Sequence, residues 1–104
     1  MLKDQLISQA TDNINEATAL AQQGDVHGSM AAYEEALRDL HSVGPSNDRD
    51  VLLAQVYLAR YENASKFKLS PDVSDLRSGY SYAKTTKDVK ARALAETLWQ
   101  AYKE

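Results

Sequence analysis

The amino-acid sequence predicts an all-α protein built from repeated helical units. Apolar residues recur every three or four positions along successive stretches of the chain, a spacing that only a helix brings to one face. No stretch alternates polar and apolar residues over the length of a strand. The pattern Tyr33-x-x-Ala36 also recurs, 47 residues later, as Tyr80-x-x-Ala83. A period of about 20–50 residues is typical of helical units that bury their apolar faces by stacking.

The first two helices are expected at residues 2–23 and 26–42. The apolar stripe of the first consists of Leu2, Leu6, Ile7, Ala10, Ile14, Ala17, Leu20 and Ala21. Gly24 can adopt the left-handed conformation that ends a helix, and Asp25 can cap the next helix. The stripe of the second helix consists of Val26, Met30, Tyr33, Ala36, Leu37 and Leu40. A Gly-Pro pair at residues 44–45 then ends this hairpin.

The third and fourth helices are expected to form a second hairpin. The third begins at Ser46 or Asp48 and reaches about Phe67. Its apolar positions cover much of its circumference, which favours a central helix; they are Leu52, Leu53, Val56, Tyr57, Leu58, Ala59, Tyr61, Ala64 and Phe67. The fourth helix, residues 71–84, has Ser70 as its expected N-cap and a proline at its first position. Its stripe consists of Val73, Leu76, Tyr80 and Ala83.

A fifth helix is expected to begin at Thr85 or Thr86, with Asp88 just after its start. Its stripe consists of Ala91, Leu94, Ala95, Leu98, Ala101 and Tyr102. Short connections make sequential helices antiparallel neighbours. Gly79 lies inside the fourth helix, where close packing is the expected reason for a glycine. We therefore expect one domain over residues 1–104, formed by two helical hairpins and a C-terminal capping helix that stack as a superhelix.

The 47-residue offset relates positions throughout the two expected hairpins. The related pairs include Leu6 and Leu53, Ile14 and Tyr61, Ala17 and Ala64, Leu20 and Phe67, and Val26 and Val73. The break between helices follows the same offset, since Gly24 corresponds to Pro71.

Charge is distributed unevenly along the chain. Residues 1–45 contain seven acidic and two basic side chains, a net charge of −5, whereas residues 46–104 contain eight acidic and ten basic ones, a net charge of +2. The overall charge of −3 argues against binding of nucleic acid, which needs several bases on one face. Both halves can be read as solvated faces, and opposite charges could also let the repeats dock or let molecules stack head to tail.

Composition and motifs favour a non-catalytic cytoplasmic protein. The chain has no cysteine, no apparent signal peptide and no apolar run long enough to span a membrane. His27 and His41 would lie about 21 Å apart along one helix and cannot share a metal ion. Glu34 and Glu35 point in different directions on their helix, so they do not form paired carboxylates. We therefore expect no enzyme activity, no cofactor, no metal site and no membrane insertion.

The stretch from Gly24 to Leu37 resembles the turn and second helix of a tetratricopeptide repeat. The small, aromatic and alanine positions of that family would be Ser29, Tyr33 and Ala36. The second copy keeps Ala64, Phe67, Tyr80 and Ala83 but has Leu76 at the small position. The period of 47 residues exceeds the family's usual period of about 34, so the label tetratricopeptide-like describes the resemblance. Residues 2–69 also resemble a microtubule-interacting and trafficking domain, an alternative that leaves residues 70–104 unexplained.

The resemblance implies an adaptor that binds a peptide or helix of a partner protein in a groove between its helices. The positions that would face this groove are Thr11, Ile14, Thr18, Gln22, Leu58, Tyr61, Ser65 and Lys68. The basic set by which some family members hold a terminal carboxylate is missing from these positions. Such a groove favours an apolar helix with anchors one turn apart.

Self-assembly is the competing interpretation of the same sequence. The apolar side of the last helix could pack against a second copy of the chain through Leu94, Leu98, Trp99 and Tyr102. Trp99 and Tyr82 lie off the main stripes of their helices, so they are candidates for an exposed contact. A basic cluster of Lys84, Lys87, Lys90 and Arg92 surrounds the turn before the last helix, where it could bind an acidic partner or form a solvated turn.

Overall fold

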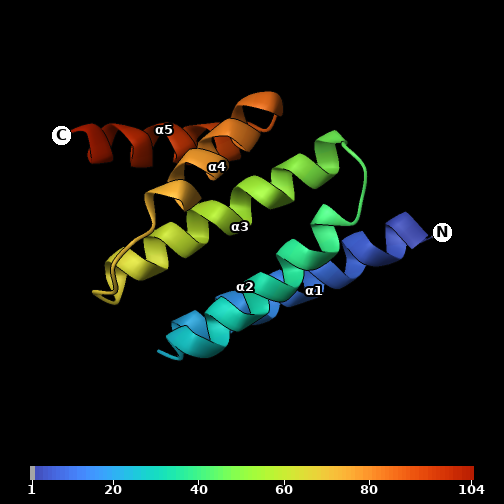
Figure 1. The fold of residues 1–104 in the computed structure, drawn as a ribbon, viewed down its shortest axis with the longest axis horizontal. Coiled ribbons are helices and arrows are strands. Elements are labelled where there is room, and N and C mark those ends of the chain that lie inside the picture. Colours follow the sequence, from blue (N-terminus) through green and yellow to red (C-terminus); the bar gives the residue numbers. More distant parts are fainter. Residues whose placement is uncertain (1) are drawn as a thin grey trace. The chain divides into compact units, whose positions relative to one another are not determined.

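The computed structural model describes residues 2–104, and these residues form an all-α structure, as the sequence predicts (Figure 1). The five helices are α1 (Leu2–Gln22), α2 (Val26–His41), α3 (Asn47–Lys66), α4 (Val73–Thr85) and α5 (Val89–Lys103). The helices pack as adjacent pairs, α1 with α2 and α3 with α4. The superhelical arrangement of the two pairs and their union in one domain stay predictions.

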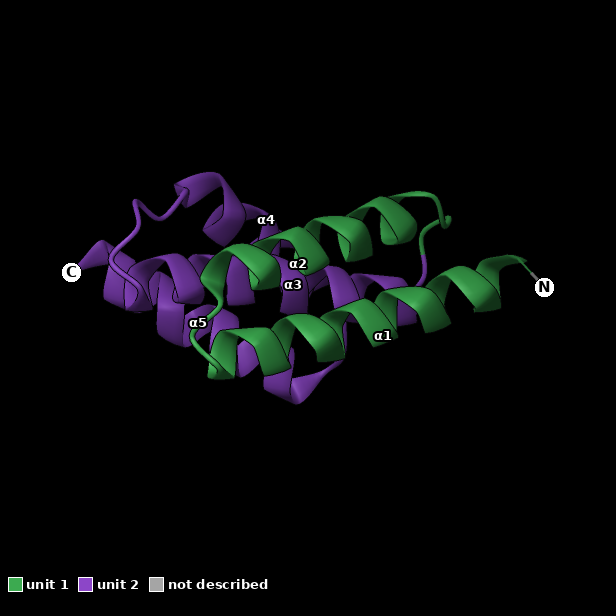
Figure 2. Ribbon diagram, turned by 90° about the horizontal axis from the view of Figure 1, so that it is seen from below, with its two compact units in different colours: residues 1–45 green, residues 46–104 purple. Residues whose placement is uncertain are grey.

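The chain divides into two compact units, residues 1–45 and residues 46–104 (Figure 2). Their boundary falls directly after the Gly-Pro pair and coincides with the change of net charge from negative to positive. The first unit contains α1 and α2, and the second contains α3, α4 and α5.

In the first unit, the turn between α1 and α2 has the geometry that its sequence predicts. Gly24 has a φ of 87°, a value that favours glycine. The amide of Asp25 donates to the Leu20 carbonyl at 2.9 Å, and that of Gly24 donates to the Ala21 carbonyl at 3.0 Å. These two hydrogen bonds form the Schellman motif that ends a helix. The Asp25 carboxylate then accepts a hydrogen bond from the Gly28 amide and caps α2.

A buried hydroxyl joins the two helices of the first unit. Ser29 is fully buried, and its Oγ donates a 2.7 Å hydrogen bond to the Ala17 carbonyl. Small residues at this crossing allow the helix backbones to approach closely. The buried apolar side chains of the unit are Ala10, Ile14, Ala17, Ala32, Tyr33, Ala36, Leu37, Leu40 and Val43.

The second unit has its own core. Its buried centre consists of Ala54, Leu58, Leu76, Ala83 and Ala95, and Tyr61, Tyr80, Tyr82, Ala91, Leu94, Leu98 and Trp99 pack against it. Gly79 faces Leu58, because a Cβ added at Gly79 would lie 2.6 Å from Leu58 Cδ2 and 3.2 Å from the Leu58 backbone nitrogen. The predicted close packing at Gly79 is therefore confirmed. The last helix, α5, packs against both α3 and α4.

The connection between α3 and α4 differs from the expected one. Lys68, with a φ of 58°, takes the place that Gly24 has in the first unit. The Leu69 amide donates to the Ala64 carbonyl at 2.8 Å, and the Lys68 amide donates to the Ser65 carbonyl at 3.3 Å, which repeats the Schellman motif. The expected correspondence of Gly24 with Pro71 is therefore wrong.

The fourth helix also starts later than expected. It begins at Val73, and its N-cap is Asp72, whose carboxylate accepts a 2.9 Å hydrogen bond from the Ser74 amide. Ser70 was expected as the N-cap of this helix. Asp72 has that role instead, because it directly precedes the first helical residue and its carboxylate reaches the Ser74 amide. The residues that end the first helices, Gly24 and Lys68, are 44 positions apart, whereas the second helices begin 47 positions apart. The extra three residues lie in the second connection.

Candidate interaction site

The structure places the expected groove residues in different environments. Ile14 is 2% exposed and Leu58 is 0% exposed, so both side chains belong to the interior. Thr11 and Thr18 are exposed, and each hydroxyl donates to the carbonyl four residues earlier in α1, at 2.9 and 3.0 Å. Tyr61 packs against the core of the second unit. The apolar anchors of the expected groove are therefore occupied in packing.

The polar members of the expected groove lie near helix ends. Gln22, Ser65 and Lys68 are exposed. Lys68 follows α3 in a left-handed conformation and thereby has a structural role in the turn. A binding role for these residues stays a prediction.

The expected assembly surface on α5 is partly used within the second unit. Leu94, Leu98 and Trp99 are half-buried and pack against its core. The Trp99 ring lies 5.0 Å from that of Tyr80 and 5.8 Å from that of Tyr102, measured between centroids. Tyr102 is 44% exposed. It is therefore the member of this set that a partner could reach most easily.

Tyr82 is half-buried as well and makes contacts within its unit. Its ring stacks on that of Tyr57 with centroids 6.0 Å apart, and the Arg49 guanidinium lies 5.9 Å from the Tyr82 centroid. Lys84 Nζ lies 4.9 Å above the Tyr80 ring. These aromatic contacts tie α4 to α3 and α5.

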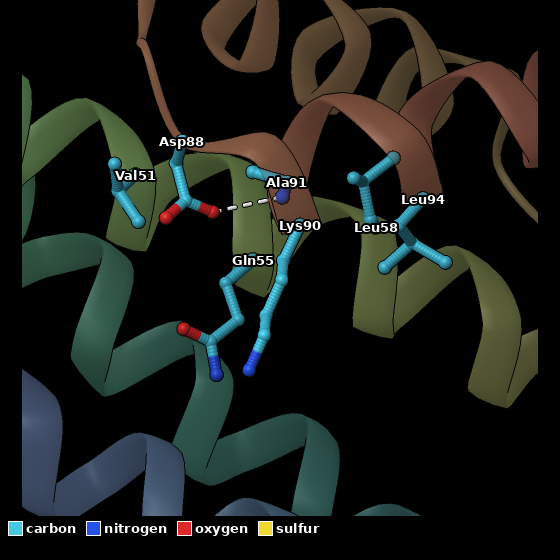
Figure 3. Close-up of a pocket in the computed structure, with 7 residues that line it drawn as sticks. All are labelled: Val51, Gln55, Leu58, Asp88, Lys90, Ala91 and Leu94. Carbon is cyan, nitrogen blue, oxygen red and sulfur yellow. Dashed lines mark hydrogen bonds between the residues drawn. The ribbon is translucent and has the colours of Figure 1, made fainter.

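A pocket of about 360 Å³ lies between α3 and α5 (Figure 3). Its lining residues are Val51, Gln55, Leu58, Asp88, Lys90, Ala91 and Leu94. Figure 3 shows Leu58 and Leu94 at one end of the pocket and Val51 with Asp88 at the other. Leu58 is fully buried, so it contributes to the interior part of the lining. The wall is mainly aliphatic, with three polar side chains among the lining residues.

The rim of this pocket is held by hydrogen bonds at the start of α5. Asp88 Oδ2 accepts a 2.8 Å hydrogen bond from the Ala91 amide, so the carboxylate is the N-cap of α5. The Asp88 amide in turn donates to the hydroxyl of Thr86, which is 2% exposed and donates to the Ala83 carbonyl at 2.8 Å. The expected start of this helix at Thr85 or Thr86 is wrong, because Thr85 is the last residue of α4, Thr86 is its C-cap, and Asp88 caps α5 instead.

The turn before α5 is also bound to the beginning of α3. The Lys87 amide donates to Asn47 Oδ1 at 3.3 Å, and the Thr85 hydroxyl donates to Asp50 Oδ2 at 3.2 Å. Asp50 additionally pairs with Arg49 at 2.9 Å. These bonds fix the connection before α5 relative to the start of α3, the two helices that line the pocket, which favours a preformed site.

The electrostatic character of the rim is basic. Lys90 lines the pocket and is exposed, and Lys87, also exposed, lies in the connection just before the N-cap of α5. In the described part of the chain, the ion pairs join Arg38 to Glu35, Arg49 to Asp50 and Arg60 to Asp75. Neither lysine belongs to these pairs.

Asp75 and Arg60 form a largely buried ion pair in the second unit. Asp75 Oδ2 lies 3.5 Å from Arg60 Nε, and this nitrogen makes no hydrogen bond to a described residue. Burial raises the pKa of Asp75 above its ordinary value, although the Arg60 charge opposes the shift. By contrast, hydrogen bonds from Ser74 lower the pKa of the exposed Asp72. Asp72 therefore has the role of an exposed helix cap, whereas Asp75 belongs to the interior of the second unit.

The two histidines of the chain lie apart on α2. His27 and His41 are exposed near opposite ends of this helix. Among residues 2–104, no group of three or more histidine, aspartate or glutamate side chains is arranged to hold a metal ion. None of the helices described is long and apolar enough to cross a membrane.

No protein-family model, curated protein or solved structure matches the chain. The resemblances to the tetratricopeptide repeat and to the microtubule-interacting and trafficking domain therefore stay predictions. What the structure supports is an all-α protein whose helices form adjacent pairs.

The pocket was missed by the sequence reasoning, although its parts were noticed separately. Leu58 was expected in a groove, Leu94 in an assembly surface and Lys90 in a basic cluster. The signal that links them is the spacing of Lys90, Ala91 and Leu94 in the last helix, because positions three and four apart are neighbours on a helix surface. The partner face on α3 could not be assigned from sequence because α3 has apolar residues around most of its circumference.

Proposed function

We propose that the protein is a non-catalytic protein-interaction module whose α3–α5 pocket receives an apolar side chain from a partner peptide or helix. The observation that supports this function best is the aliphatic pocket with a polar rim. A volume of about 360 Å³ lies within the range of about 300–1,000 Å³ typical of ligand pockets. It is small enough to select one or two side chains.

The surroundings of the pocket fit this use. Apolar anchors that enter a pocket contribute much of the affinity in protein interfaces, while the polar rim excludes water. Leu58, Ala91 and Leu94 provide the apolar wall, and Gln55 and Lys90 provide polar contacts at the rim. The adaptor function thus uses α3 together with α5, in place of the groove expected along α1 and α3.

Self-association is a second candidate function, supported by the exposure of Tyr102 at the end of α5. Light scattering over a range of protein concentrations tests it. A mass that increases with concentration, and that falls back when Tyr102→Ser is introduced, would support self-association. A constant monomer mass would rule it out.

Methyl NMR can test the proposed pocket with acetyl-leucine amide as the probe and acetyl-alanine amide as the control ligand. We expect the leucine probe to shift the methyl signals of Val51, Leu58 and Leu94. The variant Ala91→Trp should abolish these shifts because the indole fills the pocket. The matched variant Ala93→Trp, at an exposed position of the same helix, should retain them. The proposed function would be refuted if the leucine probe shifted no methyl signal of the wild type, or if it shifted the same signals in Ala91→Trp.

A further inference from the structure

We infer that the partner segment bound at the α3–α5 pocket is acidic: its apolar anchor enters the pocket, and its carboxylates lie against Lys87, Lys90 and the start of α5. This inference rests on the proposed function and adds the chemical class of the partner. It follows from the charges at the rim, from the orientation of α5 and from the composition of the first unit.

The two lysines are available to a partner carboxylate. Lys87 and Lys90 are exposed, are three residues apart on either side of the N-cap Asp88, and belong to none of the described ion pairs. The Asp88 carboxylate lies between them in the sequence, where its Oδ2 accepts the 2.8 Å bond from the Ala91 amide. Lys90 lines the pocket together with Ala91 and Leu94, so its positive charge lies beside the apolar wall.

The start of α5 adds positive charge at the same place. The amino end of a helix carries a partial positive charge, so basic side chains there are unfavourable for the helix itself. Asp88 supplies a carboxylate at the N-cap, but the first turn of α5 contains no acidic residue and includes Lys90 and Arg92. Residues that conflict with local preference are expected where function requires them. A bound carboxylate would be stabilised by both the lysines and the helix end.

A second copy of the chain is a less suitable source of these carboxylates. Residues 1–45 have a net charge of −5, but an acidic segment must also present an apolar anchor. Within residues 2–45, the exposed large apolar side chain is Leu2, at 70% exposure, and Lys3 directly follows it. In addition, Asp25 caps α2, and Glu35 pairs with Arg38 at 2.7 Å. The observations therefore favour a separate acidic segment.

Selection from a displayed library of random peptides tests the inference with the intact protein as the target. Peptides are retained when they bind the wild type and Ala93→Trp but not Ala91→Trp, so that only pocket-dependent binding is counted. We expect the retained peptides to combine an aliphatic or aromatic residue with an excess of aspartate and glutamate.

Charge variants then measure the contribution of the rim on a synthesised peptide from this set. Lys90→Glu should weaken binding by about three- to fivefold, because a rim ion pair is lost and a repulsion added. Arg92→Glu changes the net charge equally but lies on another face of α5, so it should change binding by less than about twofold. The affinity for the wild type should fall as salt is raised. Lys90→Glu should keep or raise the melting temperature, because a glutamate suits the first turn of a helix.

The possible results separate this inference from the proposed function. Pocket-dependent peptides that are neutral or basic, or equal effects of Lys90→Glu and Arg92→Glu, would overturn the acidic partner and leave the pocket function intact. No pocket-dependent peptide at all would overturn both. A dimer in sedimentation that Ala91→Trp dissociates would identify a second copy as the occupant and would overturn the separate acidic segment.

Discussion

At Gly79 the absence of a side chain allows α4 to approach α3 closely. The space that a Cβ would need is taken by Leu58, whose side chain is fully buried and whose backbone nitrogen is also nearby. An alanine would favour the helix by about 1 kcal/mol, but the neighbouring atoms cannot move away without disturbing the core. Close packing against Leu58 therefore favours glycine over alanine at position 79, despite the lower helix propensity of glycine.

We predict that Gly79→Ala destabilises the protein by roughly 1–2 kcal/mol, since overpacking a well-filled core outweighs the gain in helix propensity. Urea unfolding followed by circular dichroism measures the change. Gly44→Ala is the matched control, because no heavy atom lies within 4 Å of the added Cβ; it should change stability by less than about 0.5 kcal/mol. Equal stability of Gly79→Ala and the wild type would contradict the close approach.

Asp75 and Asp72 should respond to pH with opposite signs. The folded state raises the pKa of Asp75 through burial, so folding favours its protonated form, and its stabilising contribution is lost as pH rises through the carboxyl range. The folded state lowers the pKa of Asp72 through the Ser74 hydrogen bonds, so its contribution is present above the ordinary carboxyl pKa and is lost as pH falls.

Unfolding free energies of the wild type, Asp75→Asn and Asp72→Asn between about pH 3 and pH 7 test this pair of predictions. The stability of the wild type relative to Asp75→Asn should decrease as pH rises. Its stability relative to Asp72→Asn should increase over the same range. Parallel pH profiles for the two comparisons would show that the two carboxyl groups have similar environments.

At the scale of single elements, the ends of the helices follow from local chemistry more reliably than their packing does. Gly24, Asp25 and Ser46 predict a helix end or a cap, and each has that role in the structure. The start of α5 is an exception, because the expected Thr85 and Thr86 end α4 and Asp88 is the cap. The end of α3 was harder to predict, because the left-handed residue there is Lys68, and lysine has no preference for this conformation. Only the surrounding hydrogen bonds reveal it.

We predict that Lys68→Gly stabilises the protein by about 0.5–1 kcal/mol, because glycine adopts the left-handed conformation without a steric cost. Differential scanning calorimetry should show a higher melting temperature. The control is Lys66→Gly at the last residue of α3, where the same change should lower the melting temperature through the loss of helix propensity. A lower melting temperature for both variants would argue against the turn geometry.

At the scale of the whole molecule, the sequence predicts the class of fold but not the candidate site. The five helices could be placed because their apolar stripes have helical spacing and their caps are polar. The pocket depends on which side of α3 faces α5, and the broad apolar surface around Leu53, Val56 and Leu58 leaves that choice open. Buried Asp75 shows the same limit, since its position in a first helical turn predicts exposure.

The two compact units should differ in their ability to fold alone. Residues 46–104 have three helices and a core of their own, so this fragment should unfold cooperatively, although a domain of this size is only marginally stable. Residues 1–45 form a single helical hairpin, which should show only partial helicity. Circular dichroism and thermal unfolding of both fragments measure the difference. A fragment 46–104 without a cooperative transition would contradict this division.

The three extra residues between α3 and α4 change which positions of the two hairpins are equivalent. Three residues turn a helix by about 300°, only about 60° short of a full turn. With the 47-residue offset, α1 and α3 are compared three positions out of register, yet many apolar residues of α1 still meet apolar residues of α3. That offset relates Thr11 to Leu58. In the correct register Ile14 corresponds to Leu58, both of which are buried, and Thr11 corresponds to Gln55. Thus the exposed Thr11 of α1 is the counterpart of a residue that lines the pocket on α3.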